Sequence, residues 1–184
     1  QGLSLALGSA NFTPLEMARA YGVFANGGYL IEPYFIARVE DQKGEIMEYA
    51  NRAMLCPDCA PPTERLIDFD LGILHDPRYS KRVLSPENAF LMNELMKSVI
   101  QTGTGRRALS LGRKDLAGKT GTTNNFRDAW FSGFNRDVVT SVWIGFDTPQ
   151  ELGTRESGAR AALPIWIEYM EVALRGKPEI ALQI

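Results

Sequence analysis

The sequence is poor in the residues that metal and redox chemistry need. It contains one histidine, His75, and two cysteines, Cys56 and Cys59, among 184 residues. A structural zinc site takes four ligands, and the two cysteines and one histidine are too few, with no further candidate ligand nearby. A thioredoxin-like redox site needs a helix that begins at the first cysteine, whereas Cys59 is followed by Ala60-Pro61-Pro62, which opposes a helix. The sequence therefore predicts no metal and no cofactor.

Long apolar runs and an excess of positive charge are also missing. No run approaches the roughly 18 apolar residues that a membrane-spanning helix needs, and no signal peptide is visible. The formal net charge of −2 argues against binding to nucleic acid or to an anionic membrane surface. Because the chain starts at Gln1 and not at methionine, we expect a fragment whose targeting or anchoring segment lies upstream.

The composition is that of an ordinary folded domain. Hydrophobic residues make up 45% of the chain and charged residues 23%, which is typical of globular and not of disordered proteins. A length of 184 residues suits one domain with a substantial core.

Helix patterns occur in three places. Thr13-Pro14-Leu15-Glu16 has the form of a capping box, and the helix that it begins is expected to end at Asn26-Gly27-Gly28. Ser85-Pro86-Glu87 begins a second helix that ends at Thr102-Gly103. A third, amphipathic helix is expected over residues 161–175. The buried face of the second helix is expected to consist of Ala89, Met92, Leu95, Met96 and Val99.

Strand patterns fall into two groups. Residues 34–40 and 45–49 alternate in polarity and flank a short polar turn, which predicts a hairpin. Residues 116–123, 128–134 and 138–146 are joined by short connections, so we expect them to pair as an antiparallel meander.

Residues 51–82 are rich in proline and charge and show weak periodicity, so we expect an inserted loop. Both cysteines lie in it, and two interpretations stay open for them: a local disulfide, favoured in an oxidising compartment, or two free thiols at the surface. Within the same segment, residues 66–70 are expected to form an exposed charged turn, and His75 is expected to be a turn residue.

The most informative stretch is residues 116–123, because it combines a cation, two hydroxyls and a glycine in one strand. In an extended strand Thr120 and Thr122 share one face, while Lys119 and Gly121 share the other. Two hydroxyls on one face can together bind a carboxylate, the lysine adds a positive field, and the glycine allows a ligand to approach closely. We therefore expect an edge strand that binds an extended peptide and its terminal carboxylate.

A nucleotide-binding P-loop is the rival interpretation, because Gly118-Lys119-Thr120 matches the last three residues of that motif. The motif also needs a glycine at the position of Arg113 and a helix that begins at the lysine. Gly121 and the β-branched pair Thr122-Thr123 oppose such a helix. For the triplet alone, an ordinary polar junction between a strand and a loop also stays open. Gly103-Thr104-Gly105, with Arg106-Arg107, is a weak signal for a phosphate nest, and a helix N-terminus or a turn is the better expectation.

With its neighbouring segments, this strand resembles a known family. Lys119-Thr120-Gly121-Thr122-Thr123, followed by residues 128–134, is similar to the transpeptidase domain of bifunctional (class A) penicillin-binding proteins, in which Lys-Thr-Gly is a signature. The resemblance implies an α/β (α+β) fold of the penicillin-binding-protein and β-lactamase kind, with an antiparallel sheet flanked by helices and present only in part. It implies that residues 1–184 are the C-terminal portion of one transpeptidase domain, with a cysteine-containing insert at about residues 51–82. Further segments that match the family are Thr13 to Ala18, Tyr21, Asn26-Gly27-Gly28, Ser85-Pro86-Glu87 and Gly103-Thr104-Gly105.

Two motifs of the family are missing. The nucleophile motif Ser-x-x-Lys does not occur in the sequence. Ser9-Ala10-Asn11 has the letters of the second motif, Ser-x-Asn, but it lies just before a capped helix, where the family has a different segment. We therefore expect that the chain is one piece of a domain whose nucleophile lies upstream.

The resemblance implies a peptidoglycan D,D-transpeptidase. An upstream serine would attack the penultimate D-alanyl carbonyl of a stem peptide, an amine of a neighbouring stem would resolve the acyl-enzyme, and β-lactams would acylate the same serine. By this resemblance Lys119 and the backbone N–H of Thr122 are catalytic, the latter as an oxyanion donor. Phe126 and Trp130 are candidates for shaping the cleft, with sheet packing favoured for Trp130. The substrate-binding residues implied are Thr120, Gly121, Thr122 and Thr123.

Two alternative functions of the same fold stay open, a β-lactamase-like serine hydrolase and a non-catalytic peptidoglycan-binding module. Hydrolysis needs an added base to activate water, and the sequence does not show one. The partners implied are peptidoglycan stem peptides, β-lactam antibiotics and the upstream segment with both missing motifs, but no nucleic acid. The expected location is the periplasmic side of the bacterial inner membrane, through a single-pass anchor outside this chain, in a parent that is also a peptidoglycan glycosyltransferase.

Overall fold

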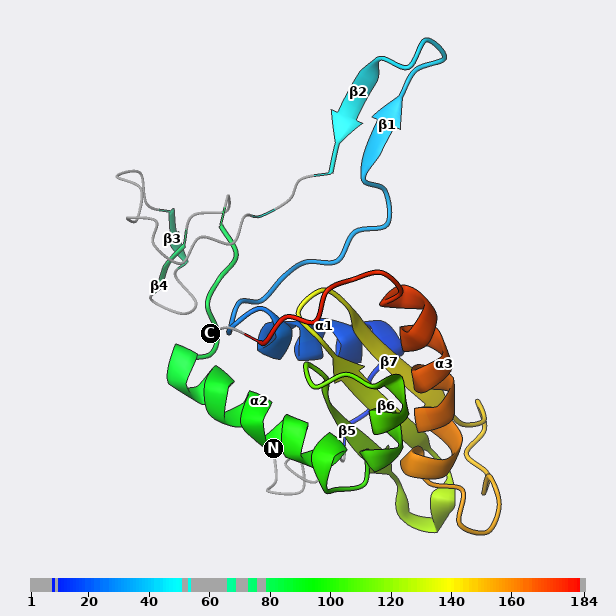
Figure 1. Ribbon diagram of the computed structural model, residues 1–184. Helices are drawn as coiled ribbons and strands as arrows, with labels where there is room; N and C mark the ends of the chain where they lie inside the picture. Colours follow the sequence, from blue (N-terminus) through cyan, green and yellow to red (C-terminus); the bar gives the residue numbers. More distant parts are fainter. Residues whose placement is uncertain are drawn as a thin grey trace.

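The computed structural model describes residues 8, 10–50, 53, 66–68, 73–75 and 79–182. A three-stranded antiparallel sheet lies at its centre, in the order β5-β6-β7 (Figure 1). These strands span Ala117–Thr122, Ala129–Phe134 and Val139–Ile144. The predicted meander is therefore confirmed, with strands slightly shorter than the sequence pattern.

In the described part of the chain, three α-helices surround this sheet. The helix α1 (Pro14–Ala25) packs against one face, α3 (Leu163–Ala173) packs against the other, and α2 (Pro86–Gln101) lies alongside β5 (Figure 1). An antiparallel sheet flanked by helices is the expected fold class, and it is confirmed.

The helix α1 begins with the capping box that the sequence predicted. The Thr13 hydroxyl accepts a hydrogen bond from the Glu16 backbone N–H at 3.2 Å, and the Glu16 carboxylate accepts one from the Thr13 backbone N–H at 2.8 Å. These bonds satisfy donors that the first helical turn leaves open. The bonds from Thr13, the backbone bond foremost, hold the pKa of the Glu16 carboxyl below its usual range. At the other end, Asn26 closes the helix as predicted.

The buried face of α2 differs from the predicted one. Its N-cap is Ser85, as expected, but Met92 is 38% exposed and Leu95 is 60% exposed. The prediction of these two residues as buried is wrong because a polar residue, Asn93, lies within the buried stripe and shifts its phase. The Asn93 amide donates to the Phe24 carbonyl oxygen at 3.0 Å, which ties α2 to the end of α1. The residues that α2 buries are Ala89, Asn93, Met96 and Ile100.

Among the residues that the structure describes, two hairpins lie outside the central sheet. The predicted hairpin is confirmed as β1 (Arg38–Glu40) and β2 (Ile46–Tyr49), which projects from the body of the molecule (Figure 1). Inside the expected insert, β3 (Leu66–Asp68) pairs antiparallel with β4 (Ile73–His75). The prediction of a charged turn over residues 66–70 is therefore wrong for the part that is described, residues 66–68, and so is the prediction of a turn residue at His75, because backbone pairing forms a short ladder there. The cysteines lie outside the described residues.

The last α-helix, α3, begins at Leu163 and ends at Ala173, inside the predicted range of 161–175. A short π-helix, η4 (Gly158–Ala162), precedes it and runs directly into it, so the helical segment as a whole begins before residue 161. A short 3₁₀ helix, η2 (Arg106–Leu111), follows α2, and a second one, η3 (Asn124–Phe126), connects β5 to β6. The helix η3 occupies a connection that was predicted as a turn, and η2 begins directly after Gly103-Thr104-Gly105, where a helix N-terminus or a turn was expected.

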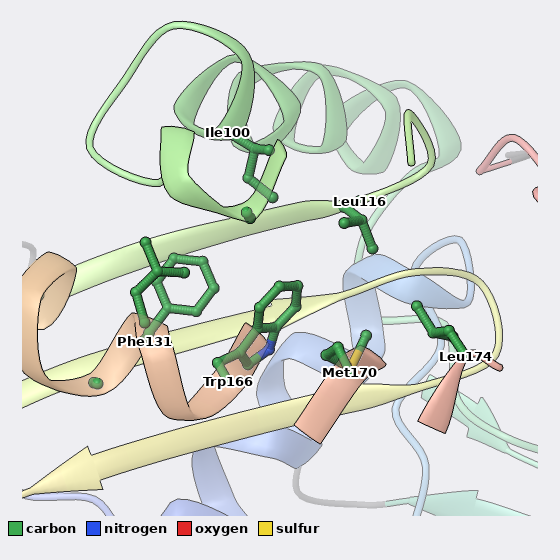
Figure 2. Close-up of a cluster of buried hydrophobic side chains, with 9 residues drawn as sticks. Ile100, Leu116, Phe131, Trp166, Met170 and Leu174 are labelled. Carbon is green, nitrogen blue, oxygen red and sulfur yellow. The ribbon is translucent and has the colours of Figure 1, made fainter. Parts of the chain in front are cut away.

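The main core lies between the sheet and α3. The Phe131 ring of β6 meets the Trp166 ring of α3 edge-to-face, with ring centroids 5.0 Å apart, and both side chains are fully buried (Figure 2). Such aromatic pairs contribute about 0.5–1.5 kcal/mol beyond the area that they bury. The Trp166 indole N–H also donates to the Gly133 carbonyl oxygen at 3.3 Å, which fixes α3 to the middle strand.

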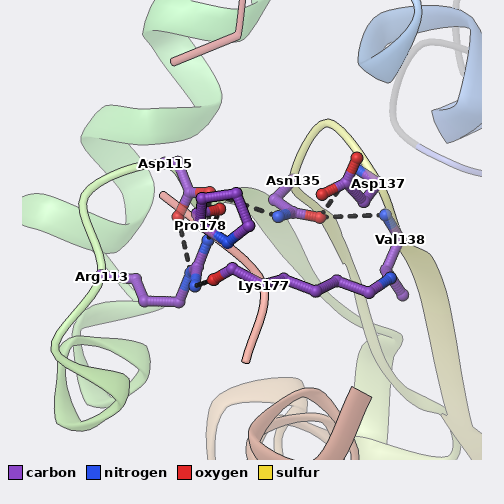
Figure 3. A network of polar contacts seen from close by, with 7 residues as sticks. All are labelled: Arg113, Asp115, Asn135, Asp137, Val138, Lys177 and Pro178. Carbon is purple, nitrogen blue, oxygen red and sulfur yellow. Dashed lines mark hydrogen bonds and ion pairs between the residues drawn. The ribbon is translucent and has the colours of Figure 1, made fainter. Parts of the chain in front are cut away.

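A buried polar network fixes the segment just before β5. Arg113 binds the Asp115 carboxylate through two donors, at 2.9 and 2.6 Å, and donates to the carbonyl oxygens of Lys177 and Pro178, both at 3.0 Å (Figure 3). The Asn135 amide donates to the same carboxylate at 3.2 Å. Burial alone raises the pKa of the Asp115 carboxyl, but the hydrogen bonds from Arg113 and Asn135 outweigh burial and hold that pKa below its usual range.

Within the described part of the chain, no helix is long and apolar enough to cross a membrane.

We expect Asp115→Asn to lower the free energy of unfolding at pH 7 by about 3 kcal/mol, because it breaks a buried ion pair. A carboxyl whose pKa is lowered by folding stabilises the protein above its unfolded pKa of about 3.9 and loses that effect as the pH falls through the folded value. The difference between wild type and variant should therefore shrink below about pH 4. Denaturant unfolding of both proteins at several pH values measures this difference in the free energy of unfolding.

The matched control for this substitution is Glu168→Gln, which removes an exposed carboxylate on α3. It should change the stability by less than about 0.5 kcal/mol at any of these pH values. A gap between wild type and Asp115→Asn that stays constant down to pH 2 would contradict the role assigned to this carboxylate.

Candidate functional site

The open edge of β5 is the centre of the candidate site. The Thr123 backbone N–H donates to the Asp128 carbonyl oxygen at 3.1 Å, so these two residues form a hydrogen-bonded pair across the strands. In an antiparallel ladder such pairs alternate with pairs that do not bond each other. The backbone N–H groups of Thr120 and Thr122 therefore point away from β6. No strand in the described residues pairs with that side of β5.

The side chains of β5 divide between the two faces of the sheet, as the alternation predicted. Thr120 lies opposite Phe131, whose ring packs toward α3, and Thr122 shares that face. Gly121 lies opposite Trp130 on the α1 side, and Lys119 shares that other face. The two threonines on one face and Lys119 and Gly121 on the other all border the open edge of β5.

Each threonine hydroxyl of this strand contacts a group from elsewhere in the chain. The Thr120 hydroxyl lies 2.7 Å from the Thr104 hydroxyl, in the loop after α2. The Thr122 hydroxyl accepts a hydrogen bond from the Gly158 backbone N–H at 3.1 Å, at the start of η4. The orientation of both hydroxyls is therefore set by contacts outside the strand.

Gly158 lies directly on the ladder between β5 and β6. A Cβ atom at this position would lie 2.2 Å from the Trp130 carbonyl oxygen and 2.5 Å from the Gly121 carbonyl oxygen. Real Cβ atoms do not come this close to backbone oxygens. Only glycine lets the start of this helix bring its N–H to the Thr122 hydroxyl.

Lys119 is exposed, and its ammonium group folds back along the strand. Nζ donates to the Thr120 carbonyl oxygen at 2.8 Å. Since that carbonyl points to the open edge, the positive charge lies at the edge beside the two hydroxyls.

The end of β5 is closed by a small polar network. The Thr123 hydroxyl accepts from the Asp128 backbone N–H at 2.8 Å and donates to the Asp128 carboxylate at 3.2 Å. The indole N–H of Trp143 donates to the other oxygen of that carboxylate at 3.0 Å. The Thr123 hydroxyl is thus engaged in the turn itself, and its predicted role in substrate binding stays a prediction.

A cavity of about 1050 Å³ lies between the start of α1 and the α1-facing side of β5 and β6. Phe12 and Met17 line it from the helix side, and Lys119 and Trp130 line it from the sheet. Trp130 also packs on Trp143, with ring centroids 6.1 Å apart, so it both packs the sheet and borders this cavity.

The other aromatic candidate, Phe126, lies in η3. Its backbone carbonyl accepts a hydrogen bond from the Leu152 N–H at 2.9 Å, which ties the β5–β6 connection to the segment before η4. Phe126 is not among the described residues that line the cavity. Its role in shaping a cleft stays a prediction.

Comparisons with known proteins match this arrangement to one family. The penicillin binding protein transpeptidase domain matches residues 1–170. The chain belongs to this family. It is 44% identical to penicillin-binding protein 1A of Pseudomonas aeruginosa, across 97% of this chain and 25% of that protein. It is 43% identical to penicillin-binding protein 1A of Neisseria lactamica, across 96% of this chain and 19% of that protein. The chain thus spans a quarter or less of the length of these curated relatives.

Solved structures of the family agree. The crystal structure of penicillin-binding protein 1A from Haemophilus influenzae aligns with 98% of this chain and 29% of that chain, at 41% identity and a TM-score of 0.83. PonA1 from Mycobacterium tuberculosis aligns with 97% of this chain and 42% of that chain, at 23% identity and a TM-score of 0.76, which supports the fold alone. The expected penicillin-binding-protein fold is confirmed.

The sequence analysis of this penicillin-binding-protein domain missed two groups that contact β5, the Gly158 backbone N–H and the Thr104 hydroxyl. The Gly158 N–H has no signal in the sequence, because its importance arises only where η4 crosses β5 and β6. Thr104 had a signal, since it lies between two glycines after a helix, but that pattern indicated a helix N-terminus or a turn and no contact with β5.

Gly158→Ala should destabilise the protein by about 2 kcal/mol, because the added methyl group forces η4 away from the sheet. The matched control is Gly22→Ala in α1, where the new Cβ would lie 3.6 Å from the Ile31 side chain, an ordinary contact. That substitution should be neutral or stabilise by up to about 1 kcal/mol through helix propensity. Thermal unfolding midpoints compare the two, and equal shifts would contradict the close approach at Gly158.

Proposed function

We propose that this chain supplies the carboxylate-binding strand of a peptidoglycan D,D-transpeptidase, an enzyme that crosslinks stem peptides and is acylated by β-lactams. The observation that carries the proposal is the open edge of β5, where Thr120 and Thr122 share one face and Lys119 adds a positive charge. Membership of the penicillin-binding protein transpeptidase family supports it.

The proposed reaction is a serine acyl transfer. A serine outside this chain attacks the penultimate D-alanyl carbonyl of a donor stem peptide, and the terminal D-alanine leaves. An amine of a second stem peptide then attacks the acyl-enzyme, which forms the crosslink and frees the serine. The backbone N–H of Thr122 is one oxyanion donor, and its direction toward the open edge supports this role.

The hydroxyls of Thr120 and Thr122 bind the terminal carboxylate of the donor. A hydroxyl group has one proton to donate and two lone pairs that accept. Because the Thr122 oxygen already accepts the Gly158 N–H, its own proton is free for a carboxylate. Lys119 strengthens the binding through its charge, and Gly121 leaves room for the peptide on the other face.

We further propose that residues 1–184 are the C-terminal portion of the transpeptidase domain of a longer, bifunctional class A protein. The small share of its relatives that the chain spans supports this. In that protein Ser-x-x-Lys and Ser-x-Asn lie upstream, together with a peptidoglycan glycosyltransferase domain and a single-pass anchor in the inner membrane. In that protein this chain lies on the periplasmic side of the membrane.

In the longer protein, Thr120→Val or Thr122→Val should slow acylation by a carboxylate-bearing penicillin. Each variant loses a charge-assisted hydrogen bond of about 1.5–3 kcal/mol, which is roughly tenfold to 150-fold in rate. Stopped-flow or gel measurement of the second-order acylation rate provides the readout.

Thr140→Val is the matched control for these two variants, because it removes a hydroxyl from β7 that donates to the Met170 sulfur at 3.5 Å and lies away from the open edge of β5. It should acylate at the rate of the wild type. Unchanged rates in both Thr120→Val and Thr122→Val would remove the carboxylate role.

A fluorescent penicillin should leave the isolated chain unlabelled and label the longer protein on a serine outside residues 1–184. The physical reason is that the chain has no Ser-x-x-Lys motif to activate a serine. Peptide mass spectrometry locates the label. Label on Ser132, whose hydroxyl is buried 2.9 Å from that of Ser141, would contradict the assignment of the nucleophile.

A further inference from the structure

The loop after α2 places a hydroxyl against the site strand. Thr104 and Thr120 lie 16 residues apart in sequence, and their Oγ1 atoms lie 2.7 Å apart. This contact lies on the face of β5 that holds both carboxylate-binding hydroxyls, and no step of the proposed reaction uses it.

The Thr104 loop is held firmly to the end of α2. The Gly105 N–H donates to the Val99 carbonyl oxygen at 2.9 Å, and the Ala108 N–H donates to the Gly105 carbonyl oxygen at 2.9 Å. Gly105 is buried, and a Cβ there would lie 3.3 Å from Ile100. The position of the Thr104 side chain is therefore set by a tight turn between two helices.

The neighbouring Thr102 shows that the helix end does not need the Thr104 hydroxyl. Thr102 lies at the C-cap of α2, and its hydroxyl donates back to the Ser98 carbonyl oxygen at 3.1 Å. The Thr104 hydroxyl points away from the helix end and contacts the Thr120 hydroxyl of β5. Thr104 is exposed, so burial does not force its hydroxyl to find a partner there.

We propose that Thr104 is a positioning residue for carboxylate binding, acting through Thr120. With an anion at the open edge, the Thr104 hydroxyl donates to the Thr120 oxygen, and the Thr120 hydroxyl donates its own proton to the carboxylate. A hydroxyl that accepts one hydrogen bond is a stronger donor in the next. The Gly158 N–H stands in the same relation to Thr122. This inference rests on the proposed transpeptidase function.

The test is the second-order acylation rate of the longer protein with a carboxylate-bearing fluorescent penicillin. Thr104→Val keeps the shape and removes the hydroxyl, and it should slow acylation about three- to tenfold, the loss expected for one neutral hydrogen bond. Thr104→Ser restores the hydroxyl and should recover most of the rate. Thr102→Val, the matched control on the same loop, should leave the rate unchanged.

A double-mutant cycle separates positioning from general structural damage. In a Thr120→Val background, Thr104→Val should cause no further slowing, because the group through which it acts is gone. The thermal midpoint of Thr104→Val should equal that of the wild type, since the side chain is exposed, and Thr104→Ala repeats the cycle if valine disturbs the loop.

The outcomes distinguish this inference from the function on which it rests. A wild-type protein that is not labelled would overturn the proposed function. A labelled wild type with no loss of rate in Thr104→Val and Thr104→Ala would overturn the positioning role alone. The same would follow if the slowing persisted at full size in the Thr120→Val background.

Discussion

The backbone pairing between β5 and β6 determines which groups of the candidate site face which way. One hydrogen bond, from the Thr123 N–H to the Asp128 carbonyl oxygen, sets the alternation for the whole ladder. It turns the backbone of Thr120 and Thr122 to the open side, and the register then assigns every side chain of β5 to a face. A slip of one residue would exchange the hydroxyls with Lys119 and Gly121. The burial of Leu116 in the core beside α3 resists such a slip, because it would turn this side chain to the other face of the sheet.

Features that depend on a few neighbouring residues were predictable from the sequence. The start of α1 is encoded in the four residues from Thr13 to Glu16, and the meander is encoded in alternating runs joined by short polar turns. The alternation of β5 also follows from local geometry alone. The Lys-Thr-Gly strand could therefore be placed correctly at an edge with its hydroxyls together before any contact was known.

Features that arise where distant segments meet were not predictable. Asn93 belongs to the buried face of α2 only because the end of α1 offers it a carbonyl oxygen, and this moved Leu95 to the surface. The contacts of Thr104 with Thr120 and of Gly158 with Thr122 join segments that no periodicity relates. The β3–β4 ladder was missed because short strands among prolines and charges carry almost no alternating pattern.

An unpaired strand edge presents a row of open N–H and C=O groups, which another sheet can extend into an aggregate. On β5 the Lys119 side chain occupies one of these open carbonyls, that of Thr120, and places a charge beside it. Charged side chains, lysine above all, are how natural proteins keep such edges from joining one another. The ammonium group that we propose attracts a carboxylate thus also keeps a second sheet from pairing with this edge, because such pairing would take an exposed charge out of water without a partner.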